Sequence, residues 1–276
     1  MVYFQISFQN KAKKLQKLFS HQFSRNIWRI LPDQDNESNL WAIELRSGQN
    51  KEVSFAVIDT GRSEVLWEAS VVGADWFSSM TAFSYKHLFL HNYRHSDIPE
   101  PTDLLMIDSG NGELQWALPN HVLVRTIDQD KIEVATRFGD KYKYLQCKAE
   151  TGLVVSDRET DGESEHRQII LAEPVRYMVG NDYFDQLASF ISRVTDGHVP
   201  VAIDYLDKRP YMMFSYYLYE QDKISEYLLI MTDQMEQLLH ERLSEGREGI
   251  GRSTVLLKGR NLVYLKNNNE FKSLTL

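Results

Sequence analysis

The 276-residue chain has a single cysteine, fewer basic than acidic residues and no long hydrophobic run. One thiol, Cys147, excludes an internal disulfide and cannot supply a cysteine-based zinc site alone. The 31 basic side chains against 39 acidic ones give a net charge of −8, which argues against a nucleic-acid partner because phosphates attract a basic surface. No stretch approaches the roughly 18 apolar residues of a membrane-spanning helix, so we expect no membrane association.

The first residues lack the order of an export signal. The apolar start, Met1 to Phe8, precedes the positive charges of Lys11, Lys13 and Lys14, whereas a secretory signal places its charges first. We therefore expect a cytoplasmic protein. The composition, 42% apolar and 25% charged, is that of a folded globular chain and indicates no particular chemistry.

An internal repeat organises the chain. The segment Ile58-Asp-Thr-Gly-Arg-Ser-Glu-Val-Leu-Trp67 aligns without gaps on Ile107-Asp-Ser-Gly-Asn-Gly-Glu-Leu-Gln-Trp116, 49 residues later. Each copy predicts a strand, a tight turn and a second strand, because Asp, Ser or Thr and Gly supply turn chemistry between apolar runs. The final tryptophan is a large apolar anchor for packing between neighbouring sheets. Residues 149–155 form a weaker third copy.

Extended segments surround these copies at a period of about 40–50 residues, which is typical of β-propeller blades. The pattern Asp-x-x-x-Gly-x-x-x-Trp, formed by Asp108, Gly112 and Trp116, resembles the repeat of PQQ-like and WD40-like β-propellers. In the earlier copy Ser63 stands at the position of the glycine. The resemblance implies blade structure only, since the vicinal cysteine pair of quinone-dependent dehydrogenases is absent.

We predict one all-β propeller domain over residues 1–276, with about five four-stranded blades. The predicted blades are residues 27–70, 73–118, 121–158, 199–243 and an incomplete 253–276. Residues 12–24 are predicted to supply a strand that closes the last blade, because closure removes an open sheet edge. Apolar residues at helical spacing predict an inserted helix over residues 182–194. Six blades is the alternative if residues 159–181 add further strands.

The innermost strands of a propeller line its channel, and the loops at their ends form its usual binding face. Candidate innermost strands are residues 27–31, 75–79, 122–127 and 199–206. They bring charged and aromatic residues near one possible ligand site: Trp28, Arg29, Asp33, Trp76, Arg125, Asp204 and Tyr205. Arginine forks hold carboxylates or phosphates, and tryptophan stacks on flat groups. The alternative interpretation is structural, with the arginines paired to acids and the aromatics packed in the core.

Two segments resemble ion-binding or phosphate-binding loops. Oxygen ligands of a calcium loop are suggested by Asp157, Glu159, Asp161 and Glu165. Gln168 replaces the final glutamate of such a loop, and the alternative is an exposed acidic loop. Residues 246–254 have the glycine frame of a phosphate-binding loop, but a β-rich run follows where that loop needs a helix.

The histidines His87, His91 and His95 recur at four-residue intervals in a strand-like segment. On a strand, His87 and His91 share a face but lie ~13 Å apart, too far to hold one ion. We therefore expect no metal centre, and the sequence indicates no cofactor.

The sequence favours a non-catalytic binding or scaffold protein that presents loops on one propeller face to a protein partner. No Ser-His-Asp, Cys-His or paired-carboxylate arrangement is identifiable from spacing. The alternative is a small-molecule binder or hydrolase at the channel mouth, which uses Arg29 and Arg125 on an anionic ligand. The fold does not decide between them, because propellers host both functions.

Overall fold

The computed structural model describes residues 15–94, 100–156 and 169–276. Contacts divide the chain into two compact units. The N-terminal unit comprises residues 18–170 and 268–271. The C-terminal unit comprises residues 171–267 and 272–276, together with the start of the chain through Lys17. The single domain over residues 1–276 stays a prediction.

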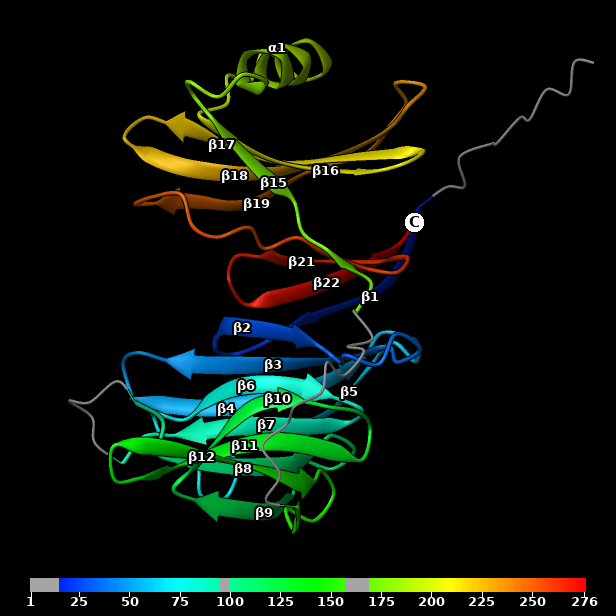
Figure 1. Cartoon of the computed structure of the whole chain (residues 1–276). Coiled ribbons are helices and arrows are strands. Elements are labelled where there is room, and N and C mark those ends of the chain that lie inside the picture. The colour runs from blue at the N-terminus through cyan, green and yellow to red at the C-terminus, as the bar shows by residue number, and fades with distance from the viewer. Residues whose placement is uncertain (1–14, 95–99, 157–168) are drawn as a thin grey trace, which may run out of the picture. The chain divides into compact units, whose positions relative to one another are not determined.

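Three four-stranded antiparallel sheets follow one another in the N-terminal unit (Figure 1). Blade one is β2 (Asn26–Pro32), β3 (Leu40–Ser47), β4 (Glu52–Asp59) and β5 (Glu64–Ala69). Blade two is β6 (Ser79–Ser84), β7 (His87–Asn92), β8 (Asp103–Asp108) and β9 (Leu114–Pro119). Blade three is β10 (His121–Thr126), β11 (Lys131–Phe138), β12 (Lys141–Lys148) and β13 (Val154–Ser156). Strand order follows chain order in each sheet, so each blade is a meander of the propeller kind.

The remaining strands of the described chain form two five-stranded sheets. Blade four is β15 (Val175–Met178), β16 (Ala202–Lys208), β17 (Tyr211–Glu220), β18 (Lys223–Thr232) and β19 (Gln237–Arg247). The last sheet has the order β1 (Gln16–Gln22), β22 (Glu270–Thr275), β21 (Asn261–Lys266), β20 (Leu256–Lys258) and β14 (Leu171–Ala172). The N-terminal strand therefore lies beside the C-terminal strand and closes the last blade, as predicted.

These sheets confirm the predicted all-β propeller-type fold of about five blades with one inserted helix. The helix, α1 (Phe184–Val194), follows β15 and covers one face of blade four (Figure 1). Its Phe184 and Ile191 pack against Phe214 and Tyr216 of β17. The described part of residues 159–181 adds β14 and β15 to existing sheets and forms no further blade.

Tryptophans of the repeat dock on the next blade, which explains the repeat. Trp67 at the end of blade one donates its Nε1–H to the carbonyl of Ser109 at 2.8 Å. A Cβ on Gly112 would lie 2.8 Å from the Trp67 ring, so the turn of blade two has room only for glycine there. Gly112 also has a φ of +78°, which side chains disfavour.

The same contact recurs one blade later. Trp116 donates to the carbonyl of Ala149 at 3.0 Å, and a Cβ on Gly152 would lie 3.0 Å from its ring. Ala149 and Gly152 belong to the weaker third copy of the repeat. The repeat therefore encodes the stacking of one blade on the next within the N-terminal unit.

Candidate functional site

The first strands of blades one to three each contain a β-bulge. The extra residue is Trp28 in β2, Thr81 in β6 and Val124 in β10. A bulge bends its strand and redirects a side chain out of the regular alternation. Trp28 is 66% exposed and Val124 is 44% exposed, so two of the three bulges present an apolar side chain to solvent.

Arg46 joins two of the predicted site residues, Trp28 and Trp76. Its Cζ lies 5.7 Å from the centre of the Trp28 ring and 5.0 Å from that of Trp76. Its Nε donates to Glu44 Oε1 at 2.7 Å, and its two terminal nitrogens donate to the carbonyls of Trp76 and Ser78 at 2.5 and 2.7 Å. Three hydrogen bonds therefore fix the orientation of the guanidinium between the two rings. Each cation–π contact contributes about 0.5–1 kcal/mol to stability.

The amide groups beside the bulges are satisfied by side chains of the preceding blade. The buried Glu44 carboxylate accepts the backbone N–H of Met80 at 2.9 Å, and Arg29 donates to the carbonyl of Met80. In the next blade, His91 Nε2 accepts the N–H of Leu123 at 3.0 Å. That contact requires an unprotonated Nε2, and burial lowers the pKa of His91 to about 4.

Arg125 lies at the position of blade three that Arg29 occupies in blade one. Each arginine directly follows the bulge and pairs in register with a buried glutamate, Glu133 or Glu44. Arg125 Nε donates to Glu133 Oε2 at 2.7 Å. Arg125 also lines a shallow groove of about 380 Å³ with Thr81 and other residues of β6 and β10.

Asp33 and Trp76 lie in loops rather than on strands. The buried Asp33 carboxylate accepts the backbone N–H groups of Asp35 and Lys86, both at 3.1 Å, and so fixes the loop after β2. Trp76 lies in a turn before β6, which begins at Ser79. The predicted innermost strand over residues 75–79 is therefore wrong, because the polar Asp75 caps a turn by accepting the N–H groups of residues 77 and 78.

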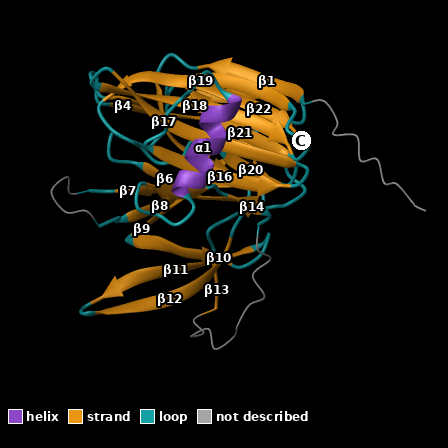
Figure 2. Ribbon diagram, turned by 90° about the horizontal axis from the view of Figure 1, so that it is seen from above, coloured by secondary structure: helices purple, strands orange, loops and turns teal. Residues whose placement is uncertain are grey.

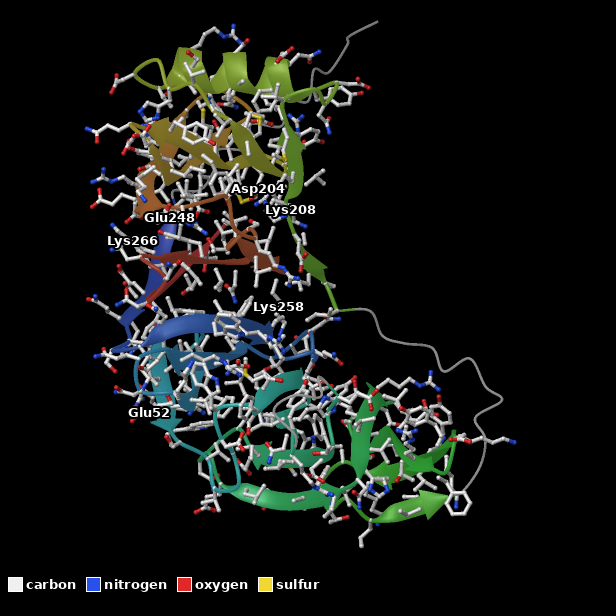
Figure 3. The ribbon with its side chains drawn as sticks, turned by 90° about the vertical axis from the view of Figure 1, so that its left-hand side faces the viewer. Glu52, Asp204, Lys208, Glu248, Lys258 and Lys266 are labelled. Atoms are coloured by element: carbon white, nitrogen blue, oxygen red, sulfur yellow. The ribbon has the colours of Figure 1, made fainter. Side chains whose placement is uncertain are left out.

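The remaining two predicted residues, Asp204 and Tyr205, belong to the C-terminal unit. They lie on β16, which is the second strand of blade four because β15 precedes it. Figure 3 labels Asp204. The predicted innermost strand over residues 199–206 is therefore wrong as well. Tyr205 packs on Phe214 with ring centres 4.9 Å apart. Asp204 is buried and accepts two hydrogen bonds of 2.7 Å from Arg176.

A buried charge network extends from Asp204 across blade four. The Tyr217 hydroxyl lies 3.2 Å from Asp204 and 3.3 Å from Glu226, and Arg247 pairs with Glu226 on the far side. Burial raises the pKa of both Glu226 and Tyr217. The loop of residues 246–254 turns the Gly251 carbonyl towards Arg176 at 2.6 Å. A phosphate-binding loop directs backbone N–H groups at its ligand, whereas this loop directs a carbonyl oxygen at an arginine. The loop therefore stabilises the charge network of blade four.

The sequence reasoning missed a cleft of about 610 Å³ at the repeat turns of blades one and two. Asp59 and Asp108, the aspartates of the two repeat copies, line it. Asp59 Oδ1 accepts the N–H of Gly61 at 2.9 Å, and Asp108 Oδ1 accepts that of Gly110 at 2.6 Å. These aspartates therefore shape their turns, which accounts for their presence in both copies.

Among residues 15–94, 100–156 and 169–276, no group of three His, Cys, Asp or Glu side chains is arranged to hold a metal ion. The calcium-loop candidates Asp157, Glu159, Asp161 and Glu165 lie outside the described residues, as does His95. In the described part of the chain, no helix has the length and apolarity needed to cross a membrane.

The chain is similar to one sequence profile and, in fold, to several solved structures. The profile of a domain of unknown function (DUF4905) matches residues 34–116, which span blades one and two. No curated protein matches this chain.

The solved structures that are similar in fold include the following three. BamB from Moraxella catarrhalis is 10% identical with a TM-score of 0.34, and the alignment covers 95% of this chain and 100% of that one. An uncharacterized protein from Listeria monocytogenes EGD-e is 7% identical with a TM-score of 0.34, covering 94% and 97%. The β-propeller domain of the Trilobed protease from Pyrococcus furiosus is 14% identical with a TM-score of 0.33, covering 90% of this chain and 64% of that one.

Proposed function

We propose that this chain is a non-catalytic scaffold that binds a protein partner at the bulge of β2 in blade one and the adjoining turn before β6 in blade two. The observation that carries the proposal is the exposed Trp28 ring held on the fixed Arg46 guanidinium beside Trp76. Tryptophan and arginine are the side chains most enriched among residues that dominate protein–protein affinity. A ring with a rigid backing also loses little conformational freedom on binding, which favours affinity.

The anionic-ligand alternative gains no support from the arginines on which it depended. Arg29 donates to the carbonyl of Met80, and Arg125 pairs with Glu133. The first contact connects blade one to blade two, and the second joins neighbouring strands of blade three. We also propose that the repeat is of the PQQ-like or WD40-like propeller kind, which the tryptophan docking of blades one to three supports. A cytoplasmic location is a further part of the proposal.

Site-specific photocrosslinking tests the proposal. Benzophenone-bearing residues replace Phe77, which is 42% exposed beside Trp76, in one variant and Tyr219 in another, in cells that express the protein natively. Trp28 stays in place in both variants. Tyr219 is 63% exposed on blade four and serves as a matched exposed aromatic control. We expect one reproducible protein adduct from position 77 that is absent from position 219. The same adducts from both positions, or none from position 77, would contradict the proposed binding site.

A further inference from the structure

Two histidines of the C-terminal unit share one tyrosine hydroxyl under α1. Tyr216 of β17 is fully buried on the face of blade four that α1 covers, and Figure 2 shows the helix lying across the strands of that blade. His198 lies in the loop of residues 195–201, which joins α1 to β16, and its Nδ1 is 2.8 Å from the Tyr216 hydroxyl oxygen. His240 of β19 places its Nε2 2.6 Å from the same oxygen. The loop is therefore tied to the sheet through one phenol.

The number of protons decides which states of this cluster are satisfied. A phenol donates one proton and accepts through its oxygen, and a neutral imidazole has one N–H and one bare nitrogen. When Tyr216 donates to one histidine, the other must donate its N–H to the phenol oxygen, so one of the two facing nitrogens must be bare. If both imidazoles are protonated, the buried phenol proton loses its acceptor, and two cations with ring centres 5.6 Å apart repel. The cluster therefore accommodates one extra proton but not two.

Burial and charge both oppose the second proton. Burial lowers the pKa of His240, and positive charge on His198 lowers it further, while Asp196 in the loop acts in the opposite direction. Glu220 at the end of β17 attracts positive charge on His198. The closed arrangement therefore favours the first proton on His198 and resists a second one on His240.

The other charged and titratable side chains of these elements keep their charge between pH 5 and 7. Tyr227 of β18 donates its hydroxyl to Glu220 at 2.8 Å, and burial raises its pKa. Hydrogen bonds from Ser225 and Tyr227 lower the pKa of Glu220, which also pairs with Arg242 of β19 across 3.8 Å. Arg193 lies in the last turn of α1, and arginine stays charged throughout this range. The pH response of this face therefore belongs to the two histidines.

We propose that the Tyr216 hydroxyl and its two histidines form an acid-sensitive latch, which holds the loop of residues 195–201 on blade four at neutral pH and releases it when both imidazoles are protonated. In the released state, neither burial nor a neighbouring cation opposes the second proton. Because the closed state disfavours that proton, lowering the pH below about 6.5 favours release by up to about tenfold per pH unit. The loop begins where α1 ends, so release also loosens the last turn of the helix. The latch includes none of the residues of the Trp28 surface, so either proposal can fail without the other.

Hydrogen–deuterium exchange with mass spectrometry tests the latch on the full-length protein at pH 7 and pH 5, with rates corrected for the intrinsic pH dependence of amide exchange. The N–H groups of Thr195 and Val201 donate to backbone carbonyls in the closed state, so their exchange reports release. Residues 228–231 of the buried strand β18 are the reference within the same blade. We expect exchange of residues 195–201 to rise roughly tenfold at pH 5 without a comparable rise in the reference. An unchanged loop, or an equal rise in both segments, would overturn the latch.

Variants identify the groups that respond. In His240→Gln an amide that cannot be protonated accepts the Tyr216 proton while protonated His198 donates, so we expect the acid response to fall below about twofold. His121→Gln is the matched control in blade three, where the ring contacts the Pro119 carbonyl at 2.8 Å, and should respond as the wild type does. Tyr216→Phe removes the shared hydroxyl and should raise exchange of the loop roughly fivefold already at pH 7. A full acid response in His240→Gln, or a loop that stays protected in Tyr216→Phe, would contradict the proposal.

Discussion

Substituting Gly112 by alanine tests whether tryptophan docking holds the blades together. The new Cβ would lie 2.8 Å from the Trp67 ring, closer than carbon atoms approach, and the residue has a φ of +78°. The backbone conformation alone costs a non-glycine residue about 1–2 kcal/mol. Forcing a methyl group into a packed contact adds about 1–3 kcal/mol. The expected loss of folding free energy is therefore about 2–5 kcal/mol.

Gly139→Ala is the matched control. Gly139 has a φ of +62° in the β11–β12 turn, and its Cβ would meet no atom within 4 Å. It therefore bears the backbone cost without the contact with tryptophan. At roughly 2–4 °C per kcal/mol for a protein of this size, the contact cost of about 1–3 kcal/mol corresponds to about 2–12 °C. We therefore expect thermal unfolding followed by circular dichroism to place Gly112→Ala at least about 2 °C below Gly139→Ala.

A double variant decides whether Trp67 is the cause. Trp67→Leu removes the aromatic ring that the Gly112 methyl group would strike. In that background, we expect Gly112→Ala to lower the melting temperature only as much as Gly139→Ala does. An undiminished effect of Gly112→Ala without the tryptophan would refute the docking account, because the two substitutions would then act independently.

Three further predictions concern stability. The pKa of His91 is about 4 in the folded protein and 6.5 in the unfolded chain. Because the unfolded chain takes up the proton first, the free energy of unfolding should fall by up to about 3 kcal/mol as the pH drops from 6.5 to 4. Urea unfolding of His91→Gln should show a flatter pH profile. Arg247→Met should cost about 3–5 kcal/mol in urea unfolding because Glu226 stays buried without its cation, whereas the exposed Arg252→Met should cost under about 0.5 kcal/mol. Trp28→Ala should change the melting temperature by less than about 3 °C, since its ring is mostly exposed.

The blades were predictable because their signals are local. Aspartate, serine or threonine and glycine specify a turn within a few residues, and the period between Trp67 and Trp116 marks the blade. Strand β15 was missed because it has only four residues and precedes a helix. Because β15 was not recognised, β16 counted as the first strand of its blade. Asp204 and Tyr205 on β16 were therefore wrongly assigned to an innermost strand.

The candidate site was predictable only in part. Trp28 and Trp76 were proposed from their nearness to innermost strands, and both lie over Arg46. Arg46 itself gave no signal, because an arginine in a strand is ordinarily a solvated side chain. Its role depends on the bulge at Trp28 and on two carbonyls more than 29 residues away in the chain. Such long-range contacts have no periodicity for a sequence pattern to reveal.

The affinity of a purified crosslinked partner for wild-type protein and for Trp28→Ala tests the proposed function most directly. Truncation of a central interface tryptophan costs about 2 kcal/mol or more, which is roughly thirtyfold in Kd. We predict a loss of at least that size for Trp28→Ala and less than about threefold for Tyr219→Ala, with both variants folded as the wild type. Equal affinities of wild type and Trp28→Ala would contradict the claim that this surface binds the partner.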